Sequence, residues 1–258
     1  MKRNSRLLII LSALLMSACV TTGGKPEPSK QQIKDAASYN LQLGISYMQM
    51  GQMQLALEKM QRSLTQDPDR ADAHMALAVL YTRLGELEKA RSEYRRSLHL
   101  DPDNSLTLNN YGAFLCKQGD YDDAIKNFDK AVKNPLYQTP AAAYSNAGLC
   151  SLDQGRDKQA ERYFRLSLQA NPRFTTSLLQ MADLSFTDKI YLQARAFMDR
   201  YMASVATAAT ADALWLGVRV EEALGDLAAA GAYSTQLLEN FPDSVEARQF
   251  LEAEQNAG

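Results

Sequence analysis

The sequence predicts an all-α protein, built as a solenoid of stacked helical hairpins. A unit of 34 residues recurs along the chain, and each unit holds two short amphipathic helical patterns joined by a turn. No stretch alternates apolar and polar residues as a half-buried strand does. In the clearest unit, residues 71–104, Gly85 separates the two patterns and Pro102 follows the second. One such hairpin cannot bury its apolar face alone, so it must stack on its copies.

The spacing within this unit resembles the tetratricopeptide repeat (TPR). The small residues Ala78 and Ala90 allow the two helices to approach closely, and Tyr94 fills the space between them. Gly85 ends the first helix in a left-handed conformation that other residues adopt only at a cost. The resemblance implies that the repeats stack into a right-handed superhelix.

The same pattern recurs before and after this unit. We expect one domain over residues 36–258, in which repeat three has a lengthened connection and repeat five carries Lys189 in place of the turn Gly. The six repeats lie near 37–70, 71–104, 105–140, 141–174, 175–210 and 211–244, and a capping helix lies at 245–258. We expect this repeat domain to be monomeric.

Residues 1–18 resemble a secretory signal peptide, with a cationic start, a short apolar run and small residues at the end. Cys19 follows, and Met16 to Cys19 resembles the lipobox of bacterial lipoproteins, although Met16 stands where Leu is usual. We therefore expect cleavage before Cys19 and a covalent lipid such as palmitate on that residue, with no other cofactor. Residues 19–35 lack an apolar period and are expected to form a flexible tether.

The expected location is the outer membrane, with the folded part on its periplasmic face. Val20 follows Cys19, whereas an Asp there would resemble an inner-membrane retention signal. The net charge is only −2, and no basic excess favours a nucleic-acid partner.

No catalytic or metal-binding constellation is evident. His74 and His99 have no Cys or carboxylate at metal-ligand spacing. No P-loop, dinucleotide-binding glycine motif or Gly-x-Ser-x-Gly occurs. Carboxylates such as Glu86 and Glu93 are mixed with Lys and Arg, which is typical of a solvated helix face. We expect a protein that is not an enzyme and has neither a metal site nor a small-molecule substrate.

Two cysteines remain after the lipobox. Cys116 and Cys150 fall in the latter halves of the first helices of repeats three and four, which stack side by side. In an oxidising periplasm a disulfide between them would close a loop of about 35 residues and stabilise the stack by about 3–4 kcal/mol on the chain-entropy model. Two buried free thiols are the alternative, and the sequence leaves both open.

The inner surface of such a stack is lined by the first helix of each repeat, and here its places are apolar. An apolar groove suits an amphipathic helix or an extended apolar segment of a partner. In the alternative, tight curvature buries these side chains against one another. Only Asn109 and Asn110 resemble a carboxylate clamp, so no clamp is expected. The expected groove residues are Leu41, Ile45, Met48, Met75, Val79, Leu106, Asn109 and Ala113.

Three stretches go beyond what the repeat pattern requires: Leu108 to Cys116 with its Asn-Asn-Tyr-Gly, the Pro135 to Tyr137 insertion, and Asn146 to Cys150. With the lipobox and six repeats, they resemble the PilW/PilF family of type IV pilus biogenesis lipoproteins, the pilotins. The likeness covers the whole chain.

The resemblance implies a non-catalytic scaffold of the outer membrane. Such a protein binds the type IV pilus secretin subunit and promotes its outer-membrane localisation and multimer assembly, which supports pilus biogenesis and twitching motility. The alternative is a general TPR adaptor lipoprotein for another envelope complex, serving outer-membrane protein insertion or cell-wall synthesis.

Overall fold

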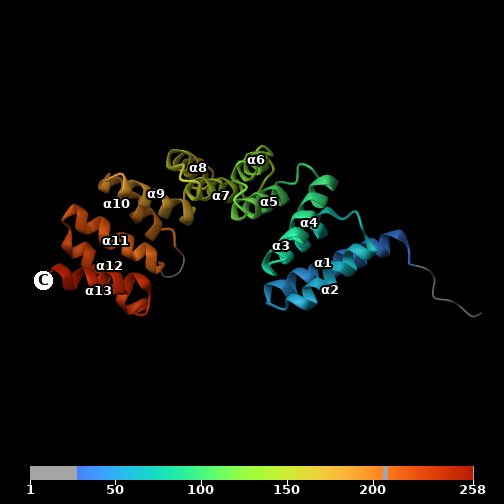
Figure 1. Cartoon of the computed structure of the whole chain (residues 1–258), viewed down its shortest axis with the longest axis horizontal. Helices are drawn as coiled ribbons and strands as arrows, with labels where there is room; N and C mark the ends of the chain where they lie inside the picture. The colour runs from blue at the N-terminus through green and yellow to red at the C-terminus, as the bar shows by residue number, and fades with distance from the viewer. Residues whose placement is uncertain (1–27, 206–208, 258) are drawn as a thin grey trace, which may run out of the picture.

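The computed structural model describes residues 28–205 and 209–257. Within these residues the chain forms thirteen α-helices and no strand, arranged as six hairpins in succession along an arc and a final helix (Figure 1). The predicted all-α solenoid of six repeats and a cap is confirmed. The hairpins are α1 (Lys30–Gln49) with α2 (Met53–Gln66), α3 (Ala71–Arg83) with α4 (Leu87–Leu100), α5 (Ser105–Lys117) with α6 (Tyr121–Ala131), α7 (Pro140–Asp153) with α8 (Asp157–Ala170), α9 (Thr175–Thr187) with α10 (Tyr191–Met202), and α11 (Ala211–Leu224) with α12 (Leu227–Asn240), and the final helix is α13 (Val245–Ala257).

The first helix begins earlier than the sequence predicts. Residues 30–35 were expected to belong to the tether, but they form the opening turns of α1. The reason is a capping box: the backbone N–H of Gln32 donates to Ser29 Oγ at 3.2 Å, and that of Ser29 donates to Gln32 Oε1 at 2.7 Å. Ile33 is the one apolar residue of residues 30–35, so no apolar period predicts a helix there, whereas the Ser-x-x-Gln spacing does.

Every hairpin turn uses the same left-handed backbone conformation. Five turns have a glycine with φ between 72° and 81°: Gly51, Gly85, Gly119, Gly155 and Gly225. In repeat five, Lys189 adopts φ 61°, which costs an L-residue about 1–2 kcal/mol. The stack therefore imposes this turn even where the sequence lacks the residue suited to it.

The two helices of each hairpin approach closely where a residue without a large side chain faces an aromatic or a methionine. Phe164 of α8 is fully buried against Gly148 of α7, where an added Cβ would lie 2.5 Å from the ring. In repeat one, Met60 of α2 occupies the same place against Gly44. The core runs along the solenoid between such pairs.

Buried serines tie the second helices of repeats one, two and four back to the first helices of the same hairpins. The hydroxyls of Ser63, Ser97 and Ser167 donate to the first carbonyls of the repeats, with oxygen–oxygen distances of 2.8, 2.8 and 2.9 Å. All three serines have no exposed surface. These bonds satisfy the buried serine hydroxyls and hold the second helix of each of these repeats against its first helix.

Candidate functional site

The expected lipidation site and signal peptide lie outside the described residues, and so does most of the expected tether. In the part of the chain that is described, no helix has both the length and the apolar character needed to span a bilayer.

The apolar inner surface of the first three repeats is largely filled by its own side chains. Leu41, Met48 and Asn109 are only 4%, 7% and 8% exposed, whereas Leu106 is 48% exposed. The other four expected groove residues are half-buried and pack against the two neighbouring cores: Ile45, Met75, Val79 and Ala113. These eight residues therefore do not form an open groove, and the alternative in which curvature buries them describes seven of them better.

The two asparagines of repeat three join neighbouring repeats. Asn109 Oδ1 accepts a hydrogen bond from Asn146 Nδ2 at 3.0 Å, which links α5 to α7. Asn110 Nδ2 lies 3.4 Å from Met75 Sδ and links α5 to α3. Both amides contact other repeats, so their place on the inner surface is explained by stacking.

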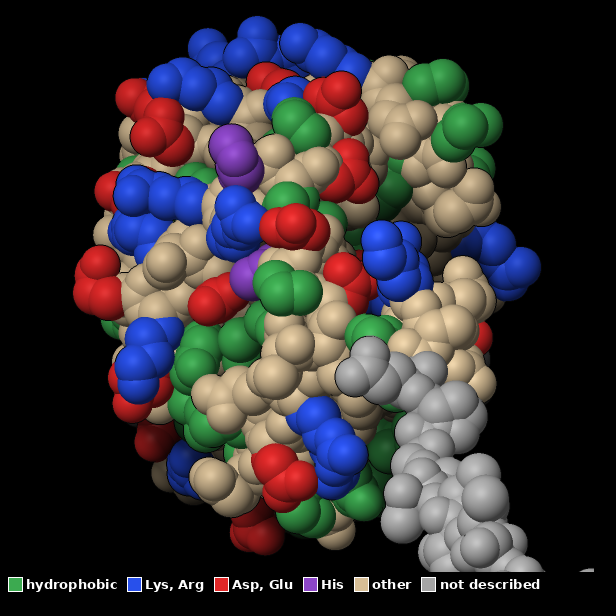
Figure 2. Space-filling model, turned by 90° about the vertical axis from the view of Figure 1, so that its right-hand side faces the viewer, with side chains coloured by type: hydrophobic (Ala, Val, Ile, Leu, Met, Phe, Trp, Pro, Cys, Tyr) green, Lys and Arg blue, Asp and Glu red, His purple; other side chains and the backbone are tan. Residues whose placement is uncertain are grey.

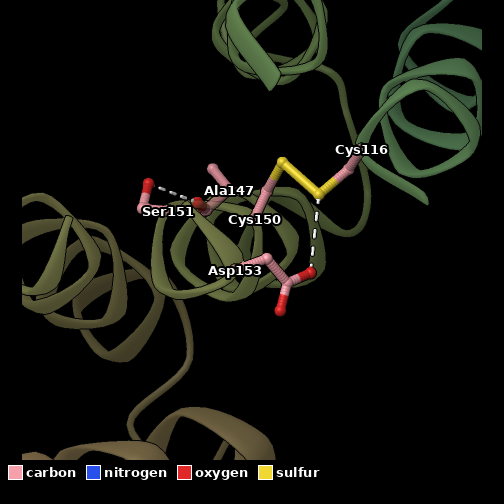
Figure 3. The surroundings of a disulfide bond; sticks show 5 residues. All are labelled: Cys116, Ala147, Cys150, Ser151 and Asp153. Atoms are coloured by element: carbon pink, nitrogen blue, oxygen red, sulfur yellow. Dashed lines mark hydrogen bonds between the residues drawn. A yellow bond between two sulfur atoms is a disulfide. The ribbon is translucent and has the colours of Figure 1, made fainter. Parts of the chain in front are cut away.

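Cys116 and Cys150 form a disulfide between α5 and α7, with a Cα–Cα distance of 5.8 Å (Figure 3). Both residues are buried, at 8% and 1% exposed. The Asp153 carboxylate lies beside the bridge, with Oδ2 at 3.9 Å from Cys116 Sγ. Of the two alternatives that the sequence leaves open, the structure has the disulfide, which links repeats three and four at the middle of the solenoid.

His74 connects the two helices of repeat two with the preceding loop. Its Nδ1 is 2.6 Å from Glu93 Oε2 and its Nε2 is 2.9 Å from the Pro68 carbonyl oxygen. Burial lowers the His74 pKa, but the hydrogen bonds to Glu93 and Pro68 outweigh it, so the pKa is raised above 6.5. Sequence spacing missed this carboxylate because the two residues face each other across the hairpin.

The surface around this pair carries both charges. Figure 2 shows Lys and Arg side chains interspersed with Asp and Glu over the N-terminal end of the solenoid. Arginines of α4 pair with aspartates of neighbouring turns: Arg96 with Asp69 at 2.6 Å and Arg91 with Asp120 at 2.9 Å. No group of three or more His, Cys, Asp or Glu side chains suited to a metal ion occurs among the described residues.

The open part of the inner surface lies at the other end of the solenoid. A cavity of about 210 Å³ is bounded by α9, α11 and α13, and Trp215 and Arg219 of α11 line it. Sequence analysis missed this site because repeat six departs from the regular pattern. The signal was present in Asp212, Trp215 and Arg219, whose spacing of three and four places them on one face of α11.

The fold is that of a TPR scaffold protein. Models of the tetratricopeptide repeat match residues 41–105 and 103–173. The chain is 34% identical to the type IV pilus assembly protein PilF of Pseudomonas aeruginosa over 247 residues, covering 94% of this chain and 96% of that one.

The similarity extends to solved structures. The P. aeruginosa PilF structure has a TM-score of 0.78 at 34% identity and covers 86% of this chain and 99% of that one. The structure of PilW, a widely conserved type IV pilus biogenesis factor, has a TM-score of 0.74 at 33% identity and covers 83% of this chain and 98% of that one. The chain belongs to the PilF/PilW family of type IV pilus biogenesis proteins.

Proposed function

We propose that this chain is an outer-membrane lipoprotein that binds the type IV pilus secretin subunit and promotes its localisation and multimer assembly. The observation that carries the proposal is the likeness to PilF along almost the whole length of both chains. It includes the irregular last repeats, so it exceeds what two unrelated TPR proteins share. In this proposal the protein acts by binding its partner rather than by catalysis, and the covalent lipid on Cys19 anchors it to the outer membrane.

The stack is suited to holding a partner in a fixed orientation. The disulfide between α5 and α7 and the Asn109–Asn146 hydrogen bond join repeats three and four, so the surfaces on either side keep their relative position. Little rearrangement of the helices is then needed when a partner binds to such a preformed surface.

The first three repeats remain the proposed secretin-binding region. The residues that a partner can reach there, however, are not the buried residues of the expected groove. Leu106 lies at the start of α5 and is 48% exposed; Tyr39 of α1 and Met50 at the end of α1 are 63% and 61% exposed. Large apolar side chains that remain accessible in a folded repeat can bury area on a partner.

The first experiment is an immunoblot of outer-membrane fractions for the secretin multimer. It compares cells with the gene, without it, and with Cys19→Ala. We expect the multimer to disappear from the outer membrane without the gene and to be misplaced with Cys19→Ala. A normal multimer in all three strains would contradict the proposal and favour an adaptor for another envelope complex.

A second experiment tests the region. Leu106→Asp is compared with Leu227→Asp, which changes a leucine that is 74% exposed at the start of α12. We expect co-purification of the secretin subunit to fall with Leu106→Asp and to persist with the control, while both variants keep their helical circular dichroism. Equal binding by both variants would place the contact elsewhere.

A further inference from the structure

Aromatic side chains pack around Arg219 and Trp215, which line the cavity between α9, α11 and α13. The guanidinium of Arg219 lies over two rings, with Cζ at 4.9 Å from the Phe186 centroid and 5.7 Å from that of Trp215. Trp215 in turn contacts Phe250 of α13 edge to face, at 6.2 Å between centroids and 70° between planes. Three inner helices therefore hold one half-buried tryptophan in a defined position.

Arg219 already interacts with these aromatic rings and with a carboxylate. Its Nη2 is 3.8 Å from Asp183 Oδ1, and its Nε is buried with no hydrogen-bond acceptor within the described ranges. The rings and the neighbouring carboxylate thus already interact with the positive charge. A group that enters the cavity meets a positioned ring system rather than a free guanidinium.

The remaining charge of the cavity is negative. Three carboxylates line it, Asp183, Asp212 and Glu246, and Arg219 is the one cationic side chain that lines it among the residues that the structure describes. Asp212 belongs to the first turn of α11 and Glu246 to the first turn of α13, and over residues 28–205 and 209–257 neither forms an ion pair. Two carboxylates from different helices therefore face the same cavity without a cation between them.

We propose that this cavity binds a segment of a partner protein in which a Lys or Arg stands next to an apolar side chain. The cation lies near Asp212 and Glu246, where its charge complements theirs, and the apolar side chain packs on Trp215 and on Leu179 of α9. Asp212 and Arg219 are separated by about 10 Å along α11, which is enough length for two adjacent side chains. This site is separate from the proposed secretin-binding region and does not depend on it.

The probe is an immobilised library of acetylated hexapeptides with varied charged and apolar residues. The mature chain is compared with the double variant Asp212→Asn/Glu246→Gln. The matched control, Asp157→Asn/Glu239→Gln, removes an exposed carboxylate from the first turn of α8 and another from α12. We expect the mature chain and the control to retain peptides with Lys or Arg beside Leu, Met or Phe, and the cavity variant to bind them about tenfold more weakly.

Trp215 provides a second readout because it is the only tryptophan in the chain. Titration with a retained peptide is expected to shift its emission and to saturate, with the weaker affinity again confined to the cavity variant. Equal binding by the cavity variant, or the absence of any retained basic peptide, would overturn the proposal. Retention of acidic peptides that is lost with Arg219→Gln would show instead that the cavity takes an anion.

Discussion

The inner surfaces at the two ends of the solenoid are built from equivalent helices but differ in openness. In the first repeats, unbranched or aliphatic side chains such as Leu41 and Met48 fold into the core and leave little accessible apolar area. In the last repeats, the charged side chains of Asp183 and Arg219 remain 51% and 35% exposed, and a cavity remains beside Trp215. The position of a residue within a repeat thus predicts that its side chain faces the inner surface. Whether that surface is open to a partner depends on whether the neighbouring side chains are buried.

The largest change in stability is expected from placing charged side chains in the filled inner surface of the first repeats. Ile45 and Val79 are half-buried against the N-terminal core, so the double variant Ile45→Asp/Val79→Asp should lower the free energy of unfolding by about 4–6 kcal/mol. Urea unfolding followed by circular dichroism measures it. At the open end, Asp212→Asn is expected to change stability by about 0.5 kcal/mol or less.

An unchanged urea midpoint for the Ile45→Asp/Val79→Asp variant would contradict the comparison, because it would mean that the two side chains are accessible. In that case the predicted groove in the first repeats would be open after all. A loss of stability on the scale given above would show that this variant cannot be used to test partner binding.

The disulfide joins repeats three and four, and so connects the N-terminal and C-terminal halves of the solenoid. Replacing both cysteines, Cys116→Ala/Cys150→Ala, should lower the free energy of unfolding by about 3–4 kcal/mol, because the unfolded chain loses the constraint of a closed loop. Urea unfolding is measured with and without dithiothreitol. Reductant should weaken the unmodified chain and leave the variant unchanged, and a variant as stable as the oxidised chain would contradict the prediction.

Repeats one and four also differ in which side chain faces the small residue of the first helix. An added methyl at Gly148 meets the rigid Phe164 ring at 2.5 Å, whereas at Gly44 it meets Met60 Cγ at 2.7 Å and the backbone atoms Ala56 O and Met60 N at 3.2 and 3.3 Å. Alanine gains up to about 1 kcal/mol of helix propensity at either position, while overpacking costs about 1–3 kcal/mol. We expect Gly148→Ala to be destabilising by about 1–2 kcal/mol and Gly44→Ala by about half as much, because the Met60 side chain can change its rotamer whereas the backbone atoms near Gly44 cannot move away, as measured by urea unfolding. Equal losses would show that Met60 cannot adjust.

The sequence predicts the fold well because the repeat constrains it at several levels. Ala78, Ala90 and the turn glycines each have a local reason for their place, and the stack imposes the same turn on Lys189. The candidate site was harder to predict, since the openness of a surface is a property of several helices. Leu106 and Met48 both fit the expected apolar face, yet one is exposed and the other is buried. The Trp215 cavity depends on α9, α11 and α13 meeting, which no single repeat contains.

The smallest effect expected is a pH dependence of the stability that arises from His74 in the N-terminal half. His74 has a raised pKa because Glu93 and the Pro68 carbonyl accept from its ring, despite the opposing effect of burial. A raised pKa in the folded state means that protonation stabilises the fold. This contribution is fully present below about 6.5, the unfolded value, and is lost as the pH rises through the folded pKa. Urea midpoints measured across this range should fall with rising pH more steeply for the unmodified chain than for His74→Gln. Parallel profiles would show that the His74–Glu93 contact carries no linked proton, and that the two ends of the solenoid do not differ in this respect.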